Sequence, residues 1–256
     1  CPFQATEMQL GTKIIRIDLT TQFPGSGSLS GQGLTRGATA CLTVHMEFPP
    51  TDVTSPHREK HRITYDADVV LRTLDEALIC HVGFDAGGPL VLPMIHARVD
   101  DVLYVHASTG SGLGLSEMPV SVCVTVSLVD GLVLAKSQFN HSLNYRCVVI
   151  RGAAELVTDE AEKQLALAAI TEHVSPGRST SSRPANARES AATAVLRIPL
   201  RAVSAKVRTG PPEEEPEDID LPFWSGVIPT RLTAGPPQAA DAGTWPEPDS
   251  GARFRQ

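Results

Sequence analysis

The segment HASTGSG, at residues 106–112, gathers one imidazole, three hydroxyl groups and two glycines in seven residues. An apolar run precedes it, so the segment leaves the end of a predicted strand. Backbone N–H groups and Ser or Thr hydroxyls in such a loop can hold a phosphate. His106 stands first in the segment, and an imidazole, which ordinarily titrates near pH ~6.5, can exchange protons at working pH. An ordinary polar turn is the alternative interpretation.

A second polar cluster, FNHSLNYRCVVI at residues 139–150, leads directly into an apolar strand. Tyr145 and Arg146 begin that strand, whose other members are apolar. An Arg at the mouth of a barrel requires an anionic partner, because its guanidinium is always charged. That partner is either a bound anion or a carboxylate of the protein itself, and the sequence leaves both open.

Other chemistry-bearing patterns are weak. Four histidines lie in or beside predicted strands, namely His81, His96, His106 and His141. They show no HxH or HExxH spacing, so unrelated histidines are predicted rather than a zinc or iron site. No GxSxG sequence is present, which argues against a serine hydrolase. Gly25, Gly27 and Gly31 have the wrong spacing for a nucleotide-binding loop, so a plain linker is predicted there.

Composition excludes several classes of protein. A net charge of −7 argues against a general nucleic-acid binder. No apolar stretch approaches the ~20 residues that cross a bilayer, and no secretory signal is recognisable. The five cysteines are Cys1, Cys41, Cys80, Cys123 and Cys147. Their odd number and wide spacing favour buried, reduced thiols over disulfides or metal ligands, and therefore a cytoplasmic location.

The elements that must position these residues are mostly short strands. Helical spacing predicts helices over residues 64–78, with Thr64 or Asp66 as N-cap, and over 159–174. Strands are predicted at 79–84, 89–99, 100–108 and 145–157, as two strands across 120–138, and as one or two across 194–208. Gly87-Gly88 and Asp130-Gly131 are predicted hairpin turns. The apolar patch at 221–229 should dock on the body.

This pattern predicts a mainly β fold, a six- to seven-stranded antiparallel barrel with a few helices, because helices do not alternate with strands. Residues 1–56 form a flexible N-terminal extension in this interpretation, with a short strand at GTKIIRIDLT. Residues 57–232 form the barrel domain. Residues 233–256, which are rich in Pro, Ala, Gly and Asp, form a disordered tail.

Several runs of sequence resemble one known family. They are LDEALICHVGF, VLPMIHARVDDVLYVHAS, VCVTVSLVDGLVLAKSQFNHSLNYRCVVIRGAAELV and SAKVRTGPP. These runs are similar, in the same order, to the flavin-nucleotide-binding members of the pyridoxamine 5′-phosphate oxidase superfamily, of which the nitroimidazole-resistance proteins are a neighbouring branch. The likeness extends from about His57 to Leu232.

The resemblance implies an FMN-binding split barrel that forms a homodimer with the flavin at the subunit interface. It implies roles for these residues: main-chain groups near Pro93 and Met94 against the ring, His106 and Ser108 beside the flavin, Ser111 at the phosphate, and Tyr145 and Arg146 reaching the flavin. One position departs from the family, since Gly112 stands where a basic residue is expected. Lys136 or Lys206 would have to supply that charge.

The functional expectation is an FMN-binding protein that acts as a flavin-dependent oxidoreductase on a small molecule, with His106 as the candidate catalytic residue. Two alternatives remain open. One is a flavin-binding or storage protein without turnover, and the other is a degenerate split barrel that serves as a dimeric interaction module. Fold alone does not choose among them, because the flavin carries the redox step.

Overall fold

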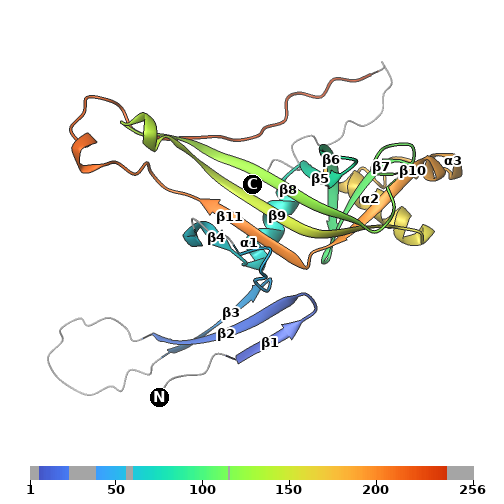
Figure 1. The fold of residues 1–256 in the computed structure, drawn as a ribbon, viewed down its shortest axis with the longest axis horizontal. Helices are drawn as coiled ribbons and strands as arrows, with labels where there is room; N and C mark the ends of the chain where they lie inside the picture. Colours follow the sequence, from blue (N-terminus) through green and yellow to red (C-terminus); the bar gives the residue numbers. More distant parts are fainter. Residues whose placement is uncertain (1–5, 23–38, 56–59, 115, 241–256) are drawn as a thin grey trace.

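Six strands of this chain close into a barrel. The computed structural model describes residues 6–22, 39–55, 60–114 and 116–240 (Figure 1). The sheet order β8-β5-β6-β7-β10-β9 returns to its start through a further pairing of β9 with β8, and every pairing is antiparallel. The strands are β5 (Ile79–Asp85), β6 (Pro89–Val99), β7 (Val102–Ser108), β8 (Val120–Leu134), β9 (Ser142–Leu156) and β10 (Thr193–Pro199). The predicted antiparallel split barrel is confirmed.

Three further strands extend this sheet to nine. β11 (Ala202–Arg208) and the short β4 (Ile63–Thr64) follow on one side of β9, and β12 (Gly226–Pro229) pairs with β8. β12 belongs to the apolar patch that was predicted to dock. β4 has only two residues, too few for an alternating pattern, so the sequence did not reveal it.

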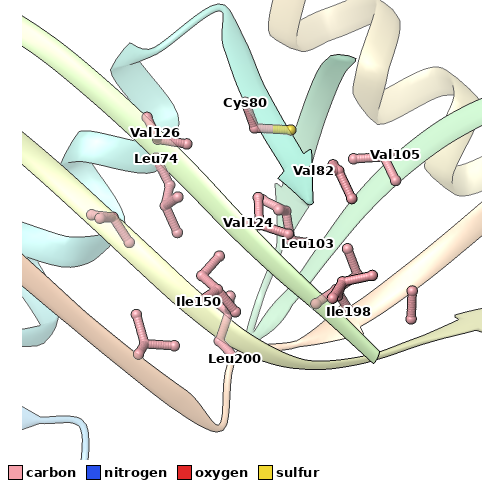
Figure 2. Close-up of a cluster of buried hydrophobic side chains, with 14 of the residues drawn as sticks. Leu74, Cys80, Val82, Leu103, Val105, Val124, Val126, Ile150, Ile198 and Leu200 are labelled. Carbon is pink, nitrogen blue, oxygen red and sulfur yellow. The ribbon is translucent and has the colours of Figure 1, made fainter. Parts of the chain in front are cut away.

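The interior of the barrel is filled by aliphatic side chains. On β8, Val122, Val124 and Val126 are buried, whereas the residues between them face outward, as the two-residue period of a strand requires. Figure 2 shows Val124 and Val126 in the same cluster as Ile150 of β9 and Leu74 of the first helix. Complete burial of a side chain of this kind contributes about 1.5–3 kcal/mol, so the core is the main source of stability.

Both predicted helices are present. α1 (Ala67–Glu76) begins after Asp66, whose Oδ1 accepts the N–H of Val69 at 3.0 Å. α2 (Glu160–Val174) lies over β6, β7 and β10. Tyr104 of β7 donates a 2.9 Å hydrogen bond to Glu162 of α2, and burial together with this bond raises the pKa of Tyr104 to about 12. No helix within the described ranges is long and apolar enough to cross a membrane.

The prediction of a hairpin turn at Asp130-Gly131 is wrong. β8 runs unbroken from Val120 to Leu134, and the pairing with β9 shifts register between Val129 and Gly131. The pair therefore forms a β-bulge, which has the same residue preferences as a tight turn. Gly131 is needed for a second reason, since a Cβ there would lie 3.0 Å from Cγ1 of Val227 on β12.

Of the described cysteines, only Cys80 is a buried thiol as predicted. Cys80 is buried in the core, and desolvation raises its pKa to about 12. Cys123 is exposed and Cys147 is half-buried, because both occupy outward-facing positions on β8 and β9. All three are free thiols.

The N-terminal segment contains more structure than the predicted short strand. β1 (Thr6–Leu10), β2 (Lys13–Gln22) and β3 (Thr39–Glu47) form a separate three-stranded sheet, drawn below the barrel in Figure 1. The turn between β1 and β2 contacts Asp101 in the β6–β7 turn. There Thr12 Oγ1 donates a hydrogen bond to Oδ2 of Asp101 at 2.8 Å, and Lys13 Nζ lies 2.6 Å from Oδ1 of the same carboxylate. The predicted glycine linker at residues 25–31 and the tail beyond residue 240 lie outside the described residues.

We predict that Asp101→Asn loosens this sheet from the barrel. Burial opposes ionisation of Asp101, but the bonds from Lys13 and Thr12 outweigh it and lower the carboxyl pKa. The contact is therefore present above the ordinary Asp pKa of ~3.9 and is lost as pH falls through the lowered value. Hydrogen exchange at neutral pH should become faster in the β1–β2 turn of Asp101→Asn. The control Asp100→Asn, which removes the neighbouring charge, should leave it unchanged. Equal exchange in the two variants would contradict the contact.

Candidate functional site

His106 lies at the edge of a cavity between β7, the start of β10 and α2. It is on β7 opposite Val195 of β10. The cavity has a volume of about 330 Å³ and is lined by residues of β7, α2, the segment after α2 and the start of β10: His106, Gln164, Leu167, Ala168, Ile170, Thr171, Ser179, Ser182, Arg183, Pro184, Ala185 and Thr193. Nδ1 of His106 is buried and has no hydrogen-bond partner in the part of the chain that the structure describes. This nitrogen therefore has a hydrogen-bonding capacity that the described residues do not use.

Arg183 brings a positive charge to the same cavity. Its guanidinium donates to both carboxylate oxygens of Glu189, at 2.8 and 2.6 Å. This pairing, with the Asn186 N–H, lowers the pKa of Glu189 to about 2. Glu189 also completes the capping box of α3 (Ala187–Ala192), so the arginine is held by a fixed helix end. Sequence reasoning missed Arg183, because it lies in a Ser-rich stretch without periodicity.

The loop after β7 is held by its own hydroxyl groups. Ser111 Oγ donates to the carbonyl of Ser108 at 2.8 Å and accepts the N–H of Gly114 at 3.1 Å, and Ser108 Oγ accepts the N–H of Gly110 at 3.3 Å. Thr109 joins the loop to the end of α3 through the carbonyl of Ala192. The serines therefore shape the loop, as the polar-turn interpretation expects. A phosphate would meet the exposed outer side of this turn, at Gly112.

Pro93 and Met94 lie on a strand with one open edge. Residues 89–95 of β6 pair with β5, but β7 pairs only with residues 96–99. Proline cannot donate to a sheet ladder, so Pro93 fits a strand whose second edge is unpaired. Met94 packs against the barrel core, whereas Pro93 is exposed. The open edge offers main-chain groups to a flat, polar-edged ligand.

Arg146 is already paired with carboxylates of the protein. It forms two bonds with Asp130, at 3.0 and 2.8 Å, and one with Glu76 of α1 at 2.5 Å. These groups line a second cavity of about 570 Å³ beside residues 230–232. Of the two partners that the sequence left open, the structure therefore contains the carboxylate. Tyr145, the residue before Arg146 on β9, is opposite Val129 of β8.

The two lysines considered as replacements for a basic residue at Gly112 lie far from the loop. Lys136 follows β8 at the tip of the β8–β9 hairpin, at the opposite end of the molecule from α3 (Figure 1). Its Nζ donates to the carbonyls of Ile219 and Leu221. Lys206 pairs with Cys147 in the middle of β9, whereas the loop leads toward Val120, which pairs with Ala154. The structure thus brings His106 and Arg183 to one cavity, places Ser108 and Ser111 in the loop that follows His106, and leaves Lys136 and Lys206 elsewhere.

The histidines do not form a metal cluster. Among the described residues, no group of three or more His, Cys, Asp and Glu side chains could hold a metal ion. His96 Nε2 contacts the carbonyl of Leu74 at 2.9 Å, and its ring lies 4.6 Å from that of His173. His141 Nδ1 contacts the carbonyl of Ser137 at 2.9 Å. Three of these histidines therefore fix local structure in different parts of the fold.

We predict that Gly114→Ala distorts the loop. A Cβ at residue 114 would lie 2.3 Å from the carbonyl oxygen of Ser108, whereas nothing lies within 4 Å of the corresponding position at Gly112. Relief of such a clash typically costs about 1–3 kcal/mol. Chemical denaturation should show a loss of this size for Gly114→Ala and a change within about 0.5 kcal/mol for the matched control Gly112→Ala. Equal stability of both variants would show that the close approach is not a constraint.

Known proteins share this fold along most of the chain. The family model described as pyridoxamine 5′-phosphate oxidase matches residues 66–207. The flavocytochrome Anf3 from Azotobacter vinelandii is 38% identical, with a TM-score of 0.74 over 80% of this chain and 98% of its own. The FAD and heme binding protein from Mycobacterium smegmatis is 32% identical, with a TM-score of 0.69 over 75% of this chain and 97% of its own. No curated protein matches the chain. The chain belongs to the pyridoxamine 5′-phosphate oxidase family.

Proposed function

We propose that this chain is a flavin-binding redox protein that also carries haem. The observation that carries the proposal is the extent of the similarity. The chain covers 98% and 97% of two proteins, one named as a flavocytochrome and one named for binding FAD and heme, at 38% and 32% identity. For the activity, we expect a flavin-dependent enzyme that passes electrons to a small molecule.

The residues present fit a flavin. The open edge of β6 at Pro93 offers main-chain groups to the polar edge of the ring. The exposed turn at Gly112 has room for a phosphate. The cavity at His106 contains an imidazole nitrogen without a hydrogen-bond partner among the described residues, and the guanidinium of Arg183, which is paired with Glu189. When bound, the flavin itself supplies the transfer of electrons, and these residues would hold it, exclude water and exchange protons at His106 Nδ1.

We further propose that the flavin is FAD rather than the FMN expected from the resemblance. The phosphate monoester of FMN carries close to two negative charges at neutral pH, whereas each phosphate of the FAD diphosphate carries one. A loop with Gly112 in place of a cation therefore suits the less charged phosphates of FAD. The adenosine part of FAD adds contacts that FMN lacks. The name of the Mycobacterium smegmatis relative supports the same choice.

A homodimer with the flavin between subunits is part of the proposal. The open edge of β6 lies beside exposed apolar side chains, including Val91, which is 59% exposed, and Ile79, which is 49% exposed. Large apolar groups on a surface favour a partner, because their burial is stabilising. A second copy of this chain would cover them and complete the flavin site from its other side.

We predict that the purified protein contains both flavin and haem. Its absorption spectrum should show flavin bands and a Soret band, and denaturation should release FAD, identified by chromatography against FMN.

Sedimentation at micromolar concentration should give twice the chain mass. Bleaching by a nicotinamide donor, followed by reoxidation with an added electrophile, would distinguish an oxidoreductase from a storage protein. If the purified protein is colourless and takes up neither flavin nor haemin, the remaining candidate function is that of a dimeric interaction module.

We predict that His106→Gln separates catalysis from binding. Glutamine keeps a donor and an acceptor but cannot titrate. If Nδ1 of His106 passes a proton to flavin or substrate, turnover should fall about 10²-fold or more while flavin affinity changes little. Stopped-flow reduction and reoxidation, normalised to bound flavin, measure this. Unchanged turnover in a fully loaded Gln variant would end the catalytic role of His106.

A further inference from the structure

The cavity beside Arg146 has no part in the proposed function. It has a volume of about 570 Å³, and sites for small molecules commonly measure about 300–1,000 Å³. It is lined by the end of α1, the second half of β8, Arg146 of β9 and residues 230–232 after β12. This lining mixes charged and apolar side chains, which is typical of a site for a small molecule.

Arg146 has hydrogen-bond donors that the protein does not use. Asp130 accepts two of its N–H groups, at 3.0 and 2.8 Å, and Glu76 accepts a third at 2.5 Å. A guanidinium has five N–H groups, so two of those on Arg146 have no acceptor within the described residues. Because the two carboxylates already hold the side chain in place, a ligand can accept from it without ordering it first.

The segment after β12 brings a second guanidinium to the cavity. Thr230 donates from its N–H to the carbonyl of Asp130 at 3.1 Å, and from Oγ1 to the carbonyl of Val129 at 2.6 Å. These two bonds hold the segment against β8, and Arg231 and Leu232 follow in the lining. Arg231 is exposed and makes no hydrogen bond or ion pair with the residues that the structure describes.

The charge that remains unpaired in this cavity is positive. Each carboxylate of the lining has a guanidinium partner. Arg98 of β6 donates to both oxygens of Asp75, at 2.9 and 2.6 Å. The other two carboxylates share Arg146. Among the described residues, Arg231 is the charged group of the lining that has no ion pair. A ligand that completes the pairing therefore carries a single negative charge.

Apolar side chains supply a surface for the rest of such a molecule. Val129 and Leu232 are 48% and 68% exposed, and Leu128 is only partly buried, although all three line the cavity. We propose that this cavity binds an organic monocarboxylate, whose head group lies at Arg231 and Arg146 and whose apolar part lies on these three side chains. The site is independent of the flavin and the haem of the proposed function.

Three probes of one shape test the sign of the charge. Naphthoate, naphthamide and naphthamidine carry a carboxylate, a neutral amide or an amidinium on the same ring carbon. In titration calorimetry with the full-length protein as purified, naphthoate should show saturable binding. The amide should bind at least about tenfold more weakly, because it lacks the charge-assisted hydrogen bonds, and the amidine should not bind. The two carboxylates that share Arg146 would favour a cation, so tighter binding of the amidine than of naphthoate would overturn the proposal.

Arg231→Gln tests the head-group end of the site. It removes the unpaired charge and should weaken naphthoate about tenfold, the lower end of the range for a hydrogen bond to a charged group. The unfolding midpoint should stay the same, because Arg231 is exposed. The matched control is Arg201→Gln, which removes an exposed arginine from the turn between β10 and β11 and should leave the affinity unchanged. Wild-type affinity in Arg231→Gln would overturn the proposed site.

A pair of opposite charges at Val129 tests the apolar surface. Val129→Asp should weaken naphthoate about fivefold or more, and Val129→Lys should strengthen it by a similar factor, because the added charge lies in the lining. The same two substitutions at Val174, exposed at the end of α2, should have no effect. If Val129→Asp fails to fold, Val129→Lys still tests the site. A change of the same sign in both variants, or no change in either, would contradict binding at this cavity.

Failure of this site and failure of the proposed function give different results. If naphthoate releases flavin from the wild-type protein, it occupies the flavin site and the carboxylate site is overturned. If the wild type shows no saturable binding of naphthoate, the carboxylate site is overturned and the proposed function stands. If the chain binds neither flavin nor haemin, the proposed function is wrong, and the same titrations still decide the carboxylate site.

Discussion

Closure of the barrel through the β8–β9 pairing is the constraint on which the rest of the structure depends. Once β9 returns to β8, each of the six strands has one face inside and one outside, and every second residue must be apolar and of suitable size. The inner positions hold Val124, Val126 and Ile150 without exposure. The outer positions need not be apolar, and they include polar and reactive groups.

The ends of the barrel contain charges that are balanced within the chain. Arg146 points to the side of β9 that faces α1, and its charge is met by Glu76 and Asp130. Removing either carboxylate would leave a partly buried guanidinium less well paired, which is costly in a medium of low dielectric constant. The bulge at Asp130 places that carboxylate beside the arginine. The same bulge brings Gly131 against β12, so local backbone geometry and charge pairing support each other.

The α2 side of the barrel has a different character. There the packing of Ala166 and Ile170 on β6, β7 and β10 stops short of a complete seal and leaves the cavity at His106. The loop after β7 and the end of α3 are joined through Thr109 and Ala192. These bonds hold the loop in one conformation beside the cavity.

The sequence by itself determined the elements whose signals are local. The short apolar runs of β5, β6 and β7, the Asp66 cap of α1 and the spacing in α2 all appear in the chain, because each depends on residues a few positions apart. Tertiary structure decided whatever depends on partners distant in the chain. Asp130-Gly131 has the composition of a turn and of a bulge alike, and only pairing with β9 and β12 selects the bulge. Arg146 pairs with Glu76, which lies 70 residues away in the sequence. Arg183 lines the cavity of His106, although its stretch of sequence has no hydrophobic periodicity. Cys123 was expected inside because it lies in an apolar run, but the two-residue period of β8 places it with Ser121 and Thr125 on the outward face, a signal that the sequence itself contains.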